Sequence, residues 1–156
     1  MHVAVASDVR AVCQRVRFAR VVVEGKVVGE IGAGWAILVG VGEEDLDADA
    51  TVLADKIVGL RAFEDNRGKM GLAAADVGAD FLVISQITLH ADTSKGRRPS
   101  FNAAARPESA RLLVDYFAQL IRDRGFRVAT GQFGAMMDLE LCNHGPVTMV
   151  LSSRDW

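Results

Sequence analysis

The sequence is poor in the residues that mark disulfide-rich, metal-binding and membrane-spanning proteins. Only two cysteines, three histidines and three prolines occur among its 156 residues, and 6% of the residues are aromatic. Cys13 and Cys142 lie in apolar stretches, which is typical of buried thiols in a reducing compartment. No H-x-x-x-H or C-x-x-C spacing occurs, and no apolar run approaches the ~18 residues of a membrane span. We therefore expect no metal, no cofactor and no membrane partner.

Charge of one sign is also lacking, because 18 basic and 20 acidic residues leave a net charge of −2. This balance excludes a strongly basic nucleic-acid binder, so any contact with nucleic acid has to be local. The N-terminus has neither a basic start nor a sustained apolar segment, which argues against a signal peptide and favours the cytoplasm. Length and composition predict a short leader over 1–8 and a single domain over 9–156.

Half of the residues are hydrophobic, and their spacing alternates between strand and helix periods. Glu24-Gly25 predicts a hairpin turn, Asp47 a helix cap, and Pro107 the first turn of a helix that ends before Gly125. The apolar run over 35–41 is typical of a strand that is buried on both faces. Strands are expected at 9–16, 18–23, 26–31, 35–41, 81–88, 138–142 and 147–152. Together with the two helices, these strands predict a mixed α/β sandwich.

The familiar catalytic motifs are missing. There is no phosphate-binding G-x-x-x-x-G-K-[ST] sequence, and no G-x-S-x-G sequence surrounds Ser85. Ser85, His90 and Asp92 are close in sequence, but this closeness does not make a catalytic triad. Thr88 is a possible nucleophile without an identifiable base, and its hydroxyl could equally satisfy backbone groups at a strand end.

Two polar segments stand out from this background. In Ser85–Leu89 (SQITL), Gln86 and Thr88 share one face of the expected strand, which leads into an irregular loop over 89–105. In Asn143–Thr148 (NHGPVT), Gly145 has no side chain and Pro146 has no backbone donor, so the pair can expose its carbonyls. An ordinary strand-to-strand turn explains the second segment as well.

These two segments, with the basic loop over 95–101 (KGRRPSF) between them, resemble the SQxTL and NxGPVT motifs of the D-aminoacyl-tRNA deacylases. The resemblance implies a three-layer mixed sheet-and-helix sandwich with a largely antiparallel, barrel-like sheet. It also implies a homodimer that hydrolyses the ester between a D-amino acid, or glycine, and the terminal adenosine of tRNA. Catalysis in the family is thought to use the 2′-hydroxyl of the RNA, with Thr88 as nucleophile a competing interpretation.

The resemblance also assigns residues to roles in a site shared by two subunits. Gly145-Pro146 corresponds to a cis peptide that enters the partner subunit's pocket and rejects L side chains by its backbone, and Arg15 helps to hold it. The other residues carried over are Ser85, Gln86 and Thr88 in the pocket wall, Phe101 near the adenosine, and Lys95 and Arg97 in the basic loop.

Two positions differ from the family motifs: Ile87 stands where the motif usually has phenylalanine, and His144 stands where it often has aspartate. The histidine can titrate near pH ~6.5, although a solvent-facing turn residue is the simpler interpretation. Two other functions remain open at this stage. One is a related deacylase that edits L-alanine mischarged on tRNA, and the other is a non-catalytic module that binds the end of tRNA.

Overall fold

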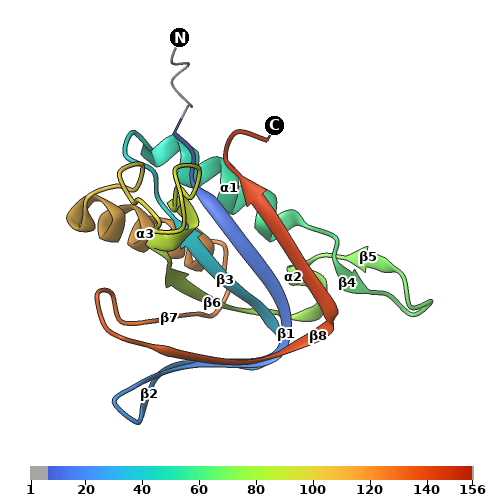
Figure 1. The fold of residues 1–156 in the computed structure, drawn as a ribbon. Coiled ribbons are helices and arrows are strands. Elements are labelled where there is room, and N and C mark those ends of the chain that lie inside the picture. Colours follow the sequence, from blue (N-terminus) through green and yellow to red (C-terminus); the bar gives the residue numbers. More distant parts are fainter. Residues whose placement is uncertain (1–6, 156) are drawn as a thin grey trace.

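The structure is a computed structural model that describes residues 7–155. Most of the leader predicted over 1–8 lies outside the described residues. The long strand β1 (Arg10–Val23) organises the sheet, and the equally long β8 (Asp138–Ser152) runs antiparallel along one of its edges (Figure 1). Along the other edge β1 pairs first with β3 (Gly34–Gly40) and then with β2 (Lys26–Ile31), both antiparallel. The strands predicted at 9–16 and 18–23 are therefore one strand.

The sheet continues from β3 through two parallel strands, β6 (Asp80–Ser85) and β7 (Val128–Thr130), and curls until β7 approaches β2. A Cβ atom on Gly29 of β2 would lie 2.2 Å from the carbonyl oxygen of Thr130. Only glycine allows the two strands to come this close. The predicted α/β class with a nearly closed, barrel-like mixed sheet is thus confirmed.

Helices α1 (Asp47–Gly59) and α3 (Pro107–Arg122) lie on the same side of this sheet (Figure 1). The short helix α2 (Ala74–Val77) and a small hairpin of β4 (Phe63–Glu64) and β5 (Met70–Leu72) complete the fold. Trp35 and Phe81 face the helices, whereas their neighbours Ala36 and Leu82 belong to a second core cluster on the opposite face. Both faces of β3 and β6 are buried, as the apolar run over 35–41 predicts.

Three local predictions are corrected by the structure. Asp47 is the first helical residue rather than the cap, and the carboxylate of Asp49 accepts a hydrogen bond from the N–H of Leu46 at 2.9 Å. The strand predicted over 81–88 ends at Ser85, so Gln86 and Thr88 do not share a strand face. The segments 138–142 and 147–152 belong to one continuous strand, β8. In each case the boundary of a helix or strand depends on a side-chain or tertiary contact, which the local spacing of residues does not reveal.

The two cysteines are free. Cys13 is fully buried, and this burial raises the pKa of its thiol to about 12. Cys142 is only partly buried, so the prediction of a buried thiol holds for Cys13 alone. Within residues 7–155, no group of three or more histidine, cysteine, aspartate or glutamate side chains is placed to hold a metal ion, and no helix is long and apolar enough to cross a membrane.

Candidate active site

The end of β6 opens into a cavity. After Ser85, the N–H of Gln86 makes a last hydrogen bond to the carbonyl of Val39 at 2.8 Å, and the chain turns into a 3-10 helix, η1 (Ile87–His90). The turn forms because the N–H of Leu89 then bonds back to Gln86 at 3.3 Å rather than across the sheet. This change of direction leaves a cavity of about 540 Å³ beside the strand end.

The cavity is apolar, and its side chains are all neutral. Ser85, Gln86 and Phe101 line it, so the structure brings these three predicted residues together. Phe101 is 38% exposed, which leaves its ring available to a flat ligand. The remaining wall comes from Leu38, Ile84, Ile87, Ala104, Ala105, Pro107, Leu139 and the segment 133–137.

Thr88 lies on η1 beside this cavity without lining it. Its side chain is exposed, and its hydroxyl oxygen accepts a hydrogen bond from Nε2 of Gln86 at 2.5 Å. Ser85, His90 and Asp92 do not form a catalytic triad in the structure. His90 is buried, with Nε2 3.2 Å from the carbonyl of Gly40, whereas Asp92 is exposed and bonded to Ser94. The hydrogen bonds from Ser94 lower the pKa of the Asp92 carboxyl below its usual range.

The basic loop follows η1 as a small hairpin. It is closed where Asp92 and Ser100 exchange two backbone hydrogen bonds of 2.7 and 2.9 Å. Lys95, Arg97 and Arg98 lie beyond this closure, and all three are exposed. The loop therefore carries a local positive charge next to the cavity, on a molecule whose net charge is only −2.

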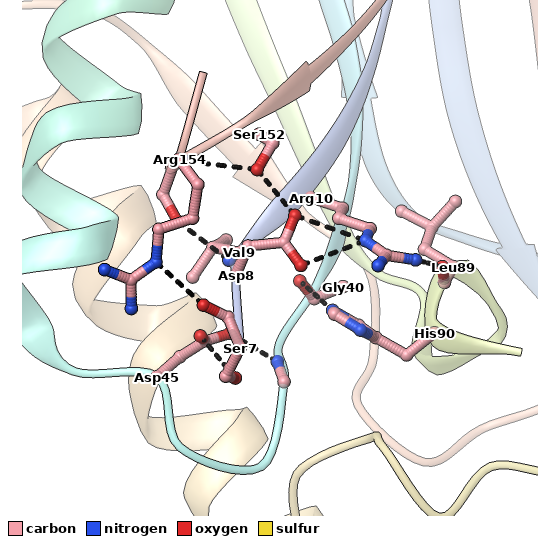
Figure 2. A network of polar contacts seen from close by, with 12 residues as sticks. Ser7, Asp8, Val9, Arg10, Gly40, Asp45, Leu89, His90, Ser152 and Arg154 are labelled. Atoms are coloured by element: carbon pink, nitrogen blue, oxygen red, sulfur yellow. Dashed lines mark hydrogen bonds and ion pairs between the residues drawn. The ribbon is translucent and has the colours of Figure 1, made fainter. Parts of the chain in front are cut away.

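A polar network ties η1 to both ends of the chain (Figure 2). Arg10 donates through Nη1 to the carbonyl of Leu89 at 3.0 Å and through Nε to Asp8 at 3.1 Å. Asp8 also accepts a hydrogen bond from the hydroxyl of Ser152 at 2.5 Å. Arg10 at the start of β1, with Asp8 and with Ser152 at the end of β8, thus holds the turn that carries Thr88.

The second predicted segment forms a bulge in β8. Gln14 pairs with Thr148 and Val16 pairs with Asn143, so Arg15 alone stands opposite residues 144–147. The Gly145–Pro146 peptide bond is cis, and both residues are exposed. Gly145 has a φ of +131°, a backbone conformation that residues with a Cβ rarely adopt. The bulge therefore presents bare backbone to the surroundings.

Arg15 holds the bulge from the inside. It is 3% exposed, and it donates through Nε to the carbonyl of His144 at 3.0 Å and through Nη1 to that of Ala62 at 2.9 Å. Its Nη2 lies 3.7 Å from Glu64, which keeps the buried charge paired. The resemblance predicted that Arg15 helps to hold Gly145-Pro146, and these contacts show how it reaches the adjoining carbonyl.

Asn143 closes the base of the bulge. Its Nδ2 donates to Oε1 of Gln14 at 3.0 Å and to Oγ1 of Thr148 at 2.9 Å, while its Oδ1 accepts from the N–H of Val147 at 3.0 Å. Three bonds from one amide fix both ends of the bulge. Asn143 belongs to the motif but is not among the predicted site residues, and its place two residues before Gly145 is the only signal for it in the sequence.

The two halves of the predicted site are separate within one chain. Arg15 and His144 line a smaller cavity of about 230 Å³ with Phe63 and Glu64, whereas Ser85, Gln86 and Phe101 line the larger one. His144 is partly buried there rather than a plain solvent-facing turn residue.

Residues 12–152 match the model of a protein family described as D-Tyr-tRNA(Tyr) deacylase. The chain belongs to this family. A "D-aminoacyl-tRNA deacylase" of Chloroflexus aurantiacus is 58% identical over 94% of this chain and 91% of its own length. Another protein of that name, from Thermus aquaticus, is 51% identical over 94% of this chain and 96% of its own length.

Two solved structures share the fold of this chain. One, titled "c-Myc DNA Unwinding Element Binding Protein", has a TM-score of 0.85 and 36% identity, covering 91% of this chain and 97% of its own. Another, titled as a probable eukaryotic D-amino acid tRNA deacylase, has a TM-score of 0.82 over 93% of this chain and 99% of its own. At 18% identity, the second likeness shows the fold alone.

Sequence reasoning missed one wall of this deacylase's cavity. Phe133, Gly134, Ala135, Met136 and Met137 line it, and none of them is among the residues predicted for the site. No period or motif marks this segment, because it is a loop whose position is set by β7 and β8 on either side.

Proposed function

We propose that this chain hydrolyses the ester bond between a D-amino acid and the 3′-terminal adenosine of tRNA. The observation that carries the proposal is the exposed Gly145-Pro146 backbone, which a buried arginine holds in place. Family membership and the names of the relatives support it. The cytoplasm, where aminoacyl-tRNA is made and used, is the proposed location.

The larger cavity is the proposed site of the terminal adenosine. Its apolar wall and the partly exposed ring of Phe101 suit the faces of a purine, and the polar side chains of Ser85 and Gln86 suit its edges or the ester. Lys95 and Arg97 lie on the exposed loop nearby, where they can meet the phosphates of the RNA.

We propose that the active enzyme is a homodimer in which the bulge of one subunit meets the cavity of the other. The separation of the bulge and the cavity within one chain supports this arrangement. Bare backbone at Gly145-Pro146 then meets the substrate's α-carbon. An L side chain would be pushed against it, whereas a D side chain, or the hydrogen of glycine, points away. D-aminoacyl and glycyl esters are therefore both substrates.

The reaction needs little from protein side chains. Water adds to the ester carbonyl, the bond to the ribose 3′ oxygen breaks, and that oxygen takes a proton, giving free amino acid and tRNA. The neighbouring 2′-hydroxyl of the RNA can relay this proton, and the neutral lining of the cavity is compatible with that role. Backbone N–H groups at the start of η1 can stabilise the negative charge on the carbonyl oxygen, at about 3–4 kcal/mol per donor.

Purified protein is expected to release tyrosine from D-Tyr-tRNA at least tenfold faster than from L-Tyr-tRNA. Each tenfold step needs only about 1.4 kcal/mol, which one steric contact supplies. The assay follows the loss of the labelled aminoacyl group, with L-Ala-tRNA as a third substrate. Preference for L-Ala-tRNA would establish the alanine-editing alternative. Binding of tRNA without turnover would establish the non-catalytic module.

Replacing Thr88 by alanine is expected to leave the rate on D-Tyr-tRNA within about threefold of wild type. The reason is that its hydroxyl contacts only Gln86 among the described residues, so its loss removes one exposed hydrogen bond of modest strength. Thr51→Ala on α1 is the matched control for loss of an exposed threonine hydroxyl. If Thr88→Ala alone abolishes turnover while the melting temperature is unchanged, Thr88 is the nucleophile.

A further inference from the structure

A second cavity adjoins the proposed adenosine site. It has a volume of about 210 Å³ and lies between α3 and the ends of β6 and β7. Ser85, Phe133 and Met137 line both cavities, so a chain of nucleotides could pass from one to the other. Figure 1 shows α3 beside the strands that supply the remaining wall.

Polar side chains without partners gather in this second cavity. Arg111 and Asp115 are one turn apart on α3, and Thr130 and Gln132 come from the end of β7. None of these four side chains makes a hydrogen bond or ion pair with any residue within 7–155. Their donors and acceptors are therefore available to a ligand.

The other walls are apolar and include Val83, Val114 and the ring of Phe133. A cavity with apolar walls and both a donor and an acceptor on one side fits a nucleobase, whose faces stack while its edge forms hydrogen bonds. A phosphate fits less well, because it would lie against the carboxylate of Asp115 as well as the guanidinium of Arg111.

We propose that this cavity binds the cytosine base of the penultimate nucleotide of the substrate. The inference rests on the proposed function: all tRNAs end in CCA, so the base next to the terminal adenosine is cytosine. Asp115 accepts a hydrogen bond from the exocyclic amine of cytosine, and Arg111 donates to its ring nitrogen and carbonyl oxygen. Carboxylates accept from this amine in other nucleic-acid complexes for the same reason.

The test changes one base of the substrate and, in separate variants, one side chain of the cavity. D-Tyr-tRNA ending in CCA or CUA is prepared by chemical aminoacylation, and kcat/KM is measured for wild type, Asp115→Asn and Arg111→Met. Uracil has a carbonyl where cytosine has the amine. Wild type is expected to favour the CCA end about tenfold, because the CUA end loses a hydrogen bond to a charged group.

Asp115→Asn is expected to reduce or reverse this preference, because the asparagine amide can donate to the uracil carbonyl. Arg111→Met should weaken use of the CCA end about tenfold. The control Asp47→Asn removes an exposed carboxylate from α1 and should keep the wild-type preference.

Two results would overturn the inference alone: equal cleavage of both ends by wild type, or an unchanged preference in both cavity variants. In either case the deacylase proposal stands. Failure of wild type to cleave either end would overturn both, so the two proposals fail in different ways.

Discussion

Gly145→Ala is expected to reduce kcat/KM for D-Tyr-tRNA about a thousandfold, which corresponds to about 4 kcal/mol of lost transition-state stabilisation. Gly145 has a φ of +131°, so a side chain there is strained before any contact is counted. The new Cβ would also lie 2.8 Å from Cγ2 of Val147 and 3.0 Å from Nη2 of Arg15. The bulge has to shift to relieve these contacts, and the backbone it presents to the substrate shifts with it.

The matched control is Gly25→Ala in the hairpin turn between β1 and β2. Gly25 also has a positive φ, +79°, but a Cβ there meets nothing within 4 Å. This variant should lose some stability and keep its activity. Circular dichroism and the melting temperature show whether each variant is folded. Full activity of a folded Gly145→Ala variant would mean that the bulge does not select the substrate.

Arg15→Met is expected to reduce kcat/KM for D-Tyr-tRNA about a hundredfold. Methionine fills much of the same volume but leaves the carbonyls of His144 and Ala62 without their donor. Two hydrogen bonds from a buried charged group amount to about 3 kcal/mol when each contributes about 1.5 kcal/mol. The same loss should lower the free energy of unfolding, since the hydrogen bond to the carbonyl of Ala62 is buried. Arg15→Lys keeps the charge but cannot donate to both carbonyls in the same way.

Arg20→Met provides the comparison on the same strand. Arg20 also lies on β1, but its side chain is 43% exposed and pairs with Glu140 at the surface. Surface ion pairs of this kind contribute little, about 0–1 kcal/mol, so activity should stay within twofold of wild type. The measurements are steady-state kinetics on D-Tyr-tRNA and thermal unfolding of each variant. Equal effects of the two substitutions would show that Arg15 has no particular role at the bulge.

Many residues of the candidate site could be predicted because they lie in two short motifs of the sequence. The segment Asn143–Thr148 combines a residue without a side chain and one without a backbone donor, which already indicated exposed backbone. Ser85 and Gln86 were predicted at the end of a buried strand, and they line the larger cavity. Thr88 was placed on the wrong element, since the polar end of its segment does not distinguish a strand from a 3-10 turn.

The amino-acid sequence by itself determined the α/β class, the place of both main helices along the chain and the two motifs. These properties depend on local periodicity and on the special backbones of glycine and proline. Only the tertiary structure decided that β8 is one bulged strand, that Arg15 contacts the bulge, and that residues 133–137 line the cavity. Those features depend on contacts such as Arg15 with His144, which are 129 positions apart in the chain. No local pattern encodes a contact at that separation, because it exists only once the sheet has closed around it.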